Sequence, residues 1–174
     1  SDVLLYDRES ESLWSQLMLK AISGRRRGEK LTLLAATHTT WGQWQKRYPE
    51  SVLLSEASAP DVRYDNNPYT DYEKSEQLWF PVQHKSAELR NKERVLGLSI
   101  NGVDKAYPHS ELANASAEFE DVVGGKKVRV VWSAESQSAY VLDSKGQQLP
   151  SVSAYWFAWF SFHPHTQIYR ANNQ

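Results

Sequence analysis

The apolar residues of this chain alternate with polar residues over several short stretches. Alternation with a period of two is typical of strands that bury one face. It predicts antiparallel hairpins that pair 3–6 with 13–17, 17–22 with 30–35, 95–100 with 103–107, and 128–132 with 138–143. Asn101-Gly102, between two apolar stretches, is the strongest hairpin signal of the four. A strand at 52–54 and a short helix at 108–114 are also expected, so the pattern indicates an α+β fold that is mostly β.

The most apolar run, 153–169, breaks this alternation and predicts a short aromatic helix that stops before Pro164. Its spacing of rings and proline occurs a second time: Trp156, Trp159, His163 and Pro164 match Trp41, Trp44, Tyr48 and Pro49. Residues three apart share a helix face, so each tryptophan pair should lie on one side of its helix. The later helix is apolar nearly all round and should be buried. The earlier helix carries polar residues and should lie on the surface, begun by a Thr40–Gln43 capping box.

The repetition extends to the hairpins, because 4–14 aligns with 130–140 without gaps. Ring faces ring at two positions of this alignment, and Glu9-Ser10 matches Glu135-Ser136. We therefore expect a single domain over 1–174, built of two pseudo-repeats at about 3–54 and 95–169. A long aromatic loop at about 55–80 should join them; such loops are often functional.

Charge and composition exclude several classes of protein. The 174 residues include 20 basic and 21 acidic ones, so the net charge of −1 gives no basic footprint for nucleic acid. No run approaches the roughly 20 apolar residues of a membrane span. Cysteine is absent, which excludes disulfides, thiolate metal sites and cysteine nucleophiles within the sequence. We expect neither a nucleic-acid partner nor a membrane span.

Several short motifs between Leu4 and Tyr169 resemble one known family. They are Tyr6-Asp-Arg-Glu, Ser12-Leu-Trp-Ser-Gln, Thr39-Thr-Trp-Gly, Phe80-Pro-Val, Val95-Leu-Gly, Asn101-Gly, Lys105-Ala-Tyr-Pro, Leu149-Pro and Trp156-Phe-Ala-Trp with His163-Pro. Together they make the chain similar to the bacterial and archaeal domain-of-unknown-function family 3179. The resemblance implies a periplasmic or extracellular protein, since members usually look secreted, periplasmic or lipid-anchored. It implies no activity, because none is established for the family.

Two departures from the family pattern limit what can be carried over. Members usually have an earlier segment with a Cys-Pro-Leu-Cys motif, and this sequence starts after it. In the second pseudo-repeat those cysteine positions correspond to Ser133 and Ser136, so a metal or redox role of the pair does not transfer. The residue before the first proline is commonly histidine in the family and is Tyr48 here.

Candidate chemistry is sparse. His163 and His165 flank Pro164 and could bind Zn²⁺ or Cu²⁺, although alternate residues across a proline seldom converge on one ion. Lys105 and Tyr107 share a sheet face, either as a reactive pair or as an ordinary half-exposed strand. Asp7 could pair with Arg8 to fix the first hairpin. No Gly-x-Ser-x-Gly motif for a serine hydrolase occurs.

We predict a non-enzymatic extracytoplasmic binding or accessory domain with an aromatic groove and no required cofactor. Its ligand, a small molecule or a protein, would contact Trp41, Trp44, Trp156, Trp159, Tyr107, Lys105, Asp7 and Arg8. The alternative is a metal-dependent hydrolase that uses the His163/His165 region. Little charge and no proline protect the strand at 3–6, so residues 3–17 should be covered by another polypeptide, for example in a homo-oligomer.

Overall fold

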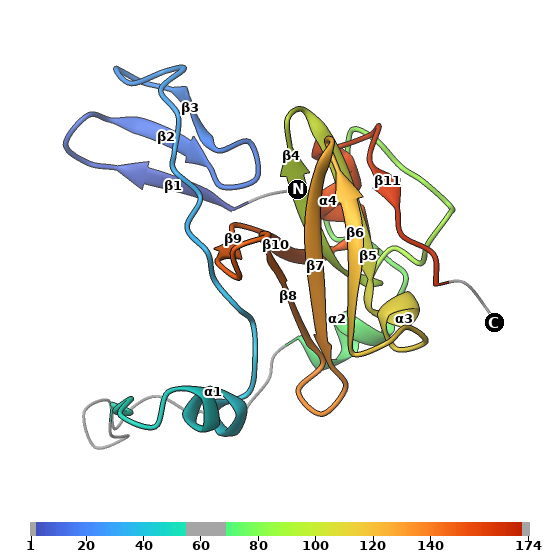
Figure 1. Cartoon of the computed structure of the whole chain (residues 1–174). Coiled ribbons are helices and arrows are strands. Elements are labelled where there is room, and N and C mark those ends of the chain that lie inside the picture. Colours follow the sequence, from blue (N-terminus) through green and yellow to red (C-terminus); the bar gives the residue numbers. More distant parts are fainter. Residues whose placement is uncertain (1–2, 55–68, 172–174) are drawn as a thin grey trace.

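The computed structural model describes residues 3–54 and 69–171; most of the regular elements in them are strands, joined by four short helices, which agrees with the predicted α+β fold that is mostly β. The first sheet has the order β1-β2-β3 and stands apart from the body of the molecule (Figure 1). Its strands are β1 (Leu4–Asp7), β2 (Ser12–Ser15) and β3 (Lys20–Ser23). The predicted pairing of the first two strands is confirmed, with Leu4 opposite Ser15 and Asp7 opposite Ser12.

A central sheet of order β10-β4-β5-β11 carries the main helix. Its strands are β4 (Arg94–Ile100), β5 (Val103–Pro108), β10 (Val152–Tyr155) and β11 (Gln167–Ile168). The turn between β4 and β5 is Asn101-Gly102, and both residues have positive φ, 52° and 78°. These angles are the ones a two-residue type I′ hairpin requires, so this prediction is confirmed.

The third sheet has the order β6-β7-β8-β9 and packs its apolar face into the core. Its strands are β6 (Glu118–Val123), β7 (Lys126–Ser133), β8 (Ser138–Leu142) and β9 (Gln148–Leu149). The hairpin of β7 and β8 is as predicted. The sequence pattern missed β6, because Glu118, Glu120 and Asp121 break up its apolar residues and only pairing with β7 makes it a strand.

The four helices are α1 (Trp41–Arg47), α2 (Thr70–Lys74), α3 (His109–Leu112) and α4 (Trp156–Phe162). In α4, Trp156 and Trp159 are fully buried against the central sheet. A side chain at Gly97 of β4 would meet the Trp159 ring at 2.4 Å, so this glycine is what lets the indole lie on the strand. Among the described helices, none has the length and apolar character needed to cross a membrane.

Two expected strands are wrong and a third feature falls partly outside the described residues. Residues 30–35 contribute only an isolated bridge between Lys20 and Lys30, and β3 pairs with β2 instead. Residues 52–54 have the sequence pattern of a strand but form none: Val52, Leu53 and Leu54 are exposed and lie outside every described strand. Of the expected loop at 55–80, positions 55–68 are outside the described residues, and the remainder contains α2.

The two matched hairpins have the same local structure. Asp7 faces Ser12 in β1–β2, and Ser133 faces Ser138 in β7–β8, which preserves the gapless alignment of the sequence. The turns also share an unusual backbone angle, since Glu11 and Gln137 occupy equivalent places with φ of 52° and 49°. The sequence repetition therefore corresponds to a repeated turn with the same strand register.

The two aromatic helices also match in detail. The indole of Trp44 donates to the Ser51 hydroxyl at 2.9 Å, and that of Trp159 donates to the Thr166 hydroxyl at 3.0 Å. Each helix ends in the same way, with the amide of the residue before the proline bonded to the tryptophan carbonyl. For α1 the Thr40 half of the predicted capping box is present, because the Thr40 hydroxyl accepts from the backbone amide of Gln43; among the described residues no hydrogen bond from the Gln43 side chain to the Thr40 amide is found.

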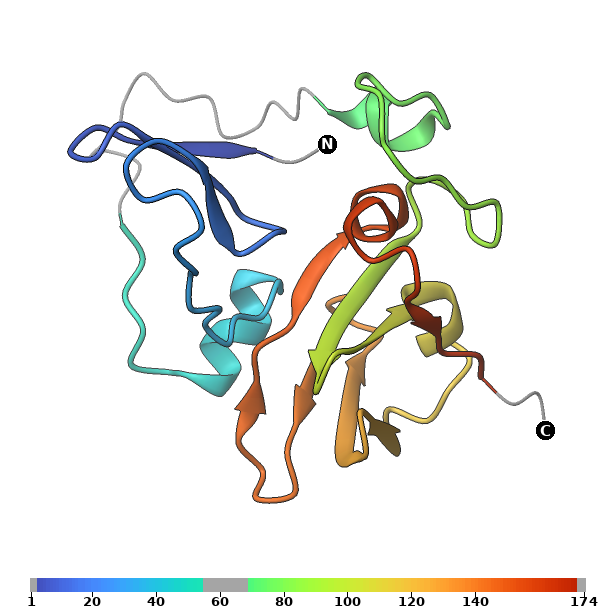
Figure 2. The ribbon, with the colours of Figure 1, turned by 90° about the horizontal axis from the view of Figure 1, so that it is seen from above.

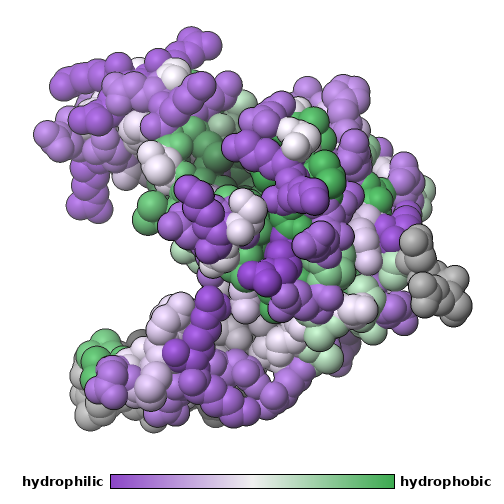
Figure 3. All heavy atoms as spheres, viewed as in Figure 1, coloured by the Kyte–Doolittle hydropathy of each residue, from purple (hydrophilic) through white to green (hydrophobic). Residues whose placement is uncertain are grey.

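The sheet of β1, β2 and β3 and the helix α1 lie on the same side of the body formed by the other two sheets (Figures 1 and 2). The molecular surface is hollowed between these two projecting parts, as the space-filling view shows (Figure 3). The second copies, β7–β8 and α4, belong instead to the body and its core.

Candidate functional site

A pocket of about 320 Å³ lies where α1 meets the turn end of the β7–β8 hairpin. It joins the helix of the first copy to the hairpin of the second. The side of α1 contributes Trp44, Lys46 and Arg47, and the hairpin contributes Ser133, Ser136, Ser138 and Tyr140. The residues just before α1 are held against the third sheet by Gln148 of β9, whose side-chain amide donates to the Thr37 hydroxyl at 2.9 Å.

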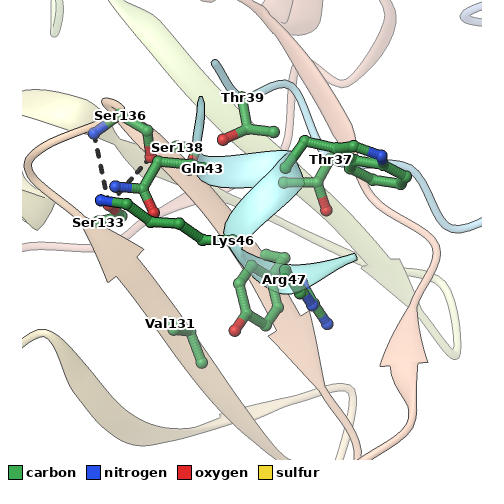
Figure 4. Close-up of a pocket in the computed structure, with 11 residues that line it drawn as sticks. Thr37, Thr39, Gln43, Lys46, Arg47, Val131, Ser133, Ser136 and Ser138 are labelled. Carbon is green, nitrogen blue, oxygen red and sulfur yellow. Dashed lines mark hydrogen bonds between the residues drawn. The ribbon is translucent and has the colours of Figure 1, made fainter. Parts of the chain in front are cut away.

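Three serine hydroxyls form a chain along one wall of the pocket (Figure 4). Ser136 Oγ donates to Ser133 Oγ at 2.9 Å, and Ser136 and Ser138 share a hydrogen bond of 2.7 Å. The Ser136 amide also donates to Ser133 Oγ at 3.4 Å. Because the turn itself makes these bonds, the hydroxyls are held in place before any ligand arrives.

Two cations line the pocket together with the serine chain. Lys46 extends from α1 toward the serine turn (Figure 4), and its Nζ lies 3.1 Å from the carboxylate of Glu135. The Arg47 guanidinium lies over the Tyr140 ring at 4.7 Å and near the Tyr48 ring at 5.4 Å. Stacking on a ring leaves the in-plane N–H groups of a guanidinium able to donate to a ligand.

A second pocket, of about 240 Å³, has a mainly apolar lining and reaches Trp159 and His163. His163 Nδ1 lies 3.0 Å from Asp104 Oδ2, and its ring stacks on the Trp159 indole with centroids 3.8 Å apart. Ser99 donates to the other oxygen of Asp104. The imidazole is therefore oriented by a carboxylate and a ring, which leaves Nε2 as its remaining polar atom.

His165 does not join His163, since it is exposed beyond Pro164. Across residues 3–54 and 69–171, no group of three or more His, Cys, Asp or Glu side chains is placed to hold a metal ion. Metal binding at these two histidines stays a prediction.

Lys105 and Tyr107 point to the same acceptor in β6. Lys105 Nζ lies 2.6 Å from Asp121 Oδ2, and the Tyr107 hydroxyl donates to that oxygen at 2.9 Å. Burial, and the negative charge of Asp121, raise the pKa of Tyr107 far above its usual value. The phenol thus stays protonated and acts as a fixed donor that ties β5 to β6.

Asp7 contacts its own turn. Its carboxylate accepts from the Ser10 hydroxyl and from the amides of Glu9 and Ser10. The hydrogen bond from the Ser10 hydroxyl is the main cause of an Asp7 pKa below the usual 3.8. No salt bridge between Asp7 and Arg8 occurs among the described residues, and Arg8 is exposed. Asp7 therefore fixes the turn through serine and backbone donors.

The predicted ligand residues are thus scattered. Trp156 and Tyr107 are fully buried, Trp159 reaches the second pocket, and Trp44 lines the first pocket, whereas Trp41 is partly exposed elsewhere on α1. The prediction missed the residues that join Trp44: Lys46, Arg47, Ser133, Ser136, Ser138 and Tyr140. Their signal was the gapless alignment of 4–14 with 130–140, in which two serines recur and an aspartate becomes Ser133.

Comparison with family models gives one match, which covers residues 1–166 and is described as "Protein of unknown function (DUF3179)". Neither curated proteins nor solved structures give a match to the chain. The match supports the family resemblance of the sequence motifs and assigns no activity.

Proposed function

The chain belongs to the DUF3179 family of proteins of unknown function, and we propose that it is a non-enzymatic extracytoplasmic domain that binds a ligand between α1 and the β7–β8 hairpin. The observation that carries this proposal is the lining of the 320 Å³ pocket. It combines hydroxyls, aromatic rings and cations, which is the mixture of apolar and convergent polar groups typical of small-molecule sites. The pocket falls in the size range of such sites.

The same lining favours binding over catalysis. Among the described residues that line the pocket, none is a histidine, an aspartate or a glutamate. The serine hydroxyls bond to one another and not to a base, so none is activated as a nucleophile. Recognition groups are present there without a proton acceptor for general-base chemistry.

The test is calorimetric titration of the folded protein with a panel of small carboxylates, phosphate, sugars and amides, followed by the same titration of Trp44→Ala. Binding that the substitution weakens supports the proposal, because Trp44 lines the pocket. Binding unaffected by Trp44→Ala, or no binding of any compound in the panel, would overturn it. The periplasmic or extracellular location rests on the family resemblance and is tested by fractionating cells that make the full-length protein.

A metal-dependent hydrolase is the second candidate, favoured by His163. Its imidazole, oriented by Asp104 at 3.0 Å, stands at the edge of an apolar pocket and could serve as a base or a ligand. Hydrolysis of aryl esters in the presence of Zn²⁺, lost in His163→Gln and kept in His165→Gln, would support this role of His163. Equal activity of His163→Gln and the unaltered protein would rule it out.

We also propose that β1 pairs with the β1 strand of a second copy of the chain. β1 and β7 are equivalent strands of the two copies. β6 pairs with one edge of β7, and the equivalent edge of β1 has no neighbouring strand among the described residues. Leu4, Leu5 and Tyr6 are uncharged and exposed, so two antiparallel β1 strands would meet without charge repulsion. Sedimentation should show a dimer that Leu5→Lys dissociates. A strict monomer at high concentration, with slowly exchanging amides at 3–6, would contradict this pairing.

A further inference from the structure

One hydroxyl hydrogen in the serine chain of the pocket has no acceptor among the described residues. Each serine hydroxyl carries one hydrogen. Ser136 gives its hydrogen to Ser133, so the hydrogen shared with Ser138 comes from Ser138. Among the hydrogen bonds of the described residues, none has the Ser133 hydroxyl as donor. The chain of donors therefore ends at Ser133 with an O–H that lacks a described protein acceptor and that borders the pocket.

The first copy supplies the missing acceptor within its own chain. Asp7 occupies the place of Ser133, and its carboxylate receives the Ser10 hydroxyl and the Ser10 amide. The amide bonds of the two turns are alike, with 3.4 Å from the Ser10 nitrogen to Asp7 and 3.4 Å from the Ser136 nitrogen to Ser133. In the first copy the Ser10 hydroxyl thus donates to a carboxylate, and in the second copy the equivalent Ser136 hydroxyl donates to a hydroxyl that needs an acceptor.

The surroundings of the two turns differ accordingly. The first turn is closed by the segment after β3: the Arg26 amide donates to Ser12 Oγ at 3.1 Å. Gly24 packs so tightly on Ser12 that a Cβ there would lie 2.6 Å from its hydroxyl oxygen. The second turn faces α1 across an open pocket. The second turn thus borders a pocket, whereas Ser12 of the first turn is covered by the segment after β3.

The charge at that place favours an anion. Lys46 and Arg47 both line the pocket, while Glu135, which is not a lining residue, neutralises part of the charge through its contact with Lys46. The rings of Trp44 and Tyr140 give the pocket an apolar side. A ligand that satisfies all of these groups has an anionic oxygen at one end and a flat apolar body at the other.

We propose that the pocket binds the carboxylate group of a small organic acid, with the Ser133 hydroxyl as its hydrogen-bond donor and Lys46 and Arg47 as its counter-charges. This inference rests on the proposed binding function and names the ligand class of the same site. A carboxylate is chosen over phosphate because the first copy has a carboxylate, that of Asp7, at the place of Ser133, where it accepts from the Ser10 hydroxyl. The apolar part of the acid lies against the aromatic side of the pocket.

Benzoate and benzamide form the matched pair that tests the proposal, because they share a ring and nearly the same size but differ in charge. Calorimetric titration should show benzoate binding at least tenfold tighter than benzamide, and Ser133→Ala should weaken benzoate binding by about tenfold, the usual loss for one hydrogen bond to a charged group. Ser10→Ala, in the closed first turn, is the control and should leave benzoate binding unchanged. Glu135→Gln should tighten binding severalfold, because it frees the charge of Lys46.

The outcomes separate this inference from the function it rests on. Equal binding of benzamide and benzoate, weakened by Trp44→Ala, would overturn the carboxylate and leave the binding site standing. Tighter binding of inorganic phosphate than of benzoate would replace the carboxylate by an inorganic oxyanion and also overturn it. Failure of every compound to bind would remove both proposals. Arg47→Gln, which leaves the serine turn intact, serves if Ser133→Ala does not fold, and should likewise weaken benzoate.

Discussion

Trp44 and Trp159 occupy the same place in the two copies of the aromatic helix, yet their surroundings are opposite. Each indole donates to a hydroxyl seven residues later, and each ring lies against the ring that follows by four residues. Trp159 is 1% exposed and Trp44 is 38% exposed. The local sequence therefore determines the helix, its cap and its indole hydrogen bond, whereas burial depends on which sheet lies beneath.

The hairpins repeat this contrast. Val130 and Trp132 of β7 are 0% and 5% exposed, and the equivalent Leu4 and Tyr6 of β1 are 46% and 58% exposed. The second copy thus serves as core, while the first copy presents the same kind of apolar face to the outside. The pocket lies at the junction of the two copies, because α1 of the first copy meets the serine turn of the second.

The largest expected effect distinguishes the two tryptophans. Trp159→Ala should lower the free energy of unfolding by about 3–5 kcal/mol, since it removes a fully buried ring. Trp44→Ala should cost about 1 kcal/mol or less, as expected of a partly exposed side chain. Chemical denaturation of both variants measures the difference. Equal losses would mean that the two helices are equally buried in solution.

A glycine in each copy gives the next effect. Gly97→Ala should destabilise the protein by about 1–3 kcal/mol, because the new methyl group would meet the Trp159 ring at 2.4 Å. Gly42→Ala in α1 has open space around the new methyl group and should stabilise the helix by roughly 0.5–1 kcal/mol. Thermal melting of the two variants should therefore shift in opposite directions. A shift of the same sign in both would contradict the packing of Trp159 on β4.

Removing the acceptors of the two indole hydrogen bonds should change the free energy of unfolding by smaller and unequal amounts. Thr166→Val leaves the buried Trp159 N–H without its acceptor and should cost about 1 kcal/mol. Thr166→Ser, which keeps the acceptor, is its control. Ser51→Ala in the first copy should have almost no effect on unfolding, because water can replace the hydroxyl at the exposed Trp44. A larger loss for Ser51→Ala than for Thr166→Val would reverse the comparison.

The two serine turns should respond differently to acid. Because the folded-state pKa of Asp7 lies below 3.8, its contribution to stability is complete above that value and is lost as the pH falls through the folded pKa. The Ser10 amide resonance should follow this titration, because that amide donates to the Asp7 carboxylate. Ser10→Ala should raise the pKa of Asp7 toward 3.8, because it removes the largest cause of the shift. An Asp7 pKa at or above 3.8 in the unaltered protein would contradict the turn geometry.

Local patterns predicted much of this fold. Asn101-Gly102, the Thr40 hydroxyl cap and the paired tryptophans each depend on contacts within a few residues, and all three are found. The strand β10 was missed because Val152 and Ala154 are paired by β4, which lies far away in sequence. The expected strand at 52–54 was wrong because strand-forming residues need a neighbouring strand, and none of the described strands pairs with them.

The candidate site was harder to predict than the fold. Trp44 was identified from its ring, but Lys46, Arg47 and the three serines acquire meaning only when α1 is placed on the β7–β8 turn. That contact joins residues about 90 positions apart, as in the pair of Lys46 with Glu135, and no periodicity reports it. The alignment of the two hairpins carried the strongest hint, since it pairs the Ser133 hydroxyl with the Asp7 carboxylate.

The most direct test of this account is a benzoate titration followed by the backbone amide resonances of the isotope-labelled protein. The account predicts saturable shifts for Ser136, Ser138 and the segment 37–47, and none for Ser10 and Ser12 in the closed turn. Shifts of equal size at both turns, or an unchanged resonance at Ser136 when the other signals saturate, would contradict the claim that only the second serine turn opens onto a binding pocket.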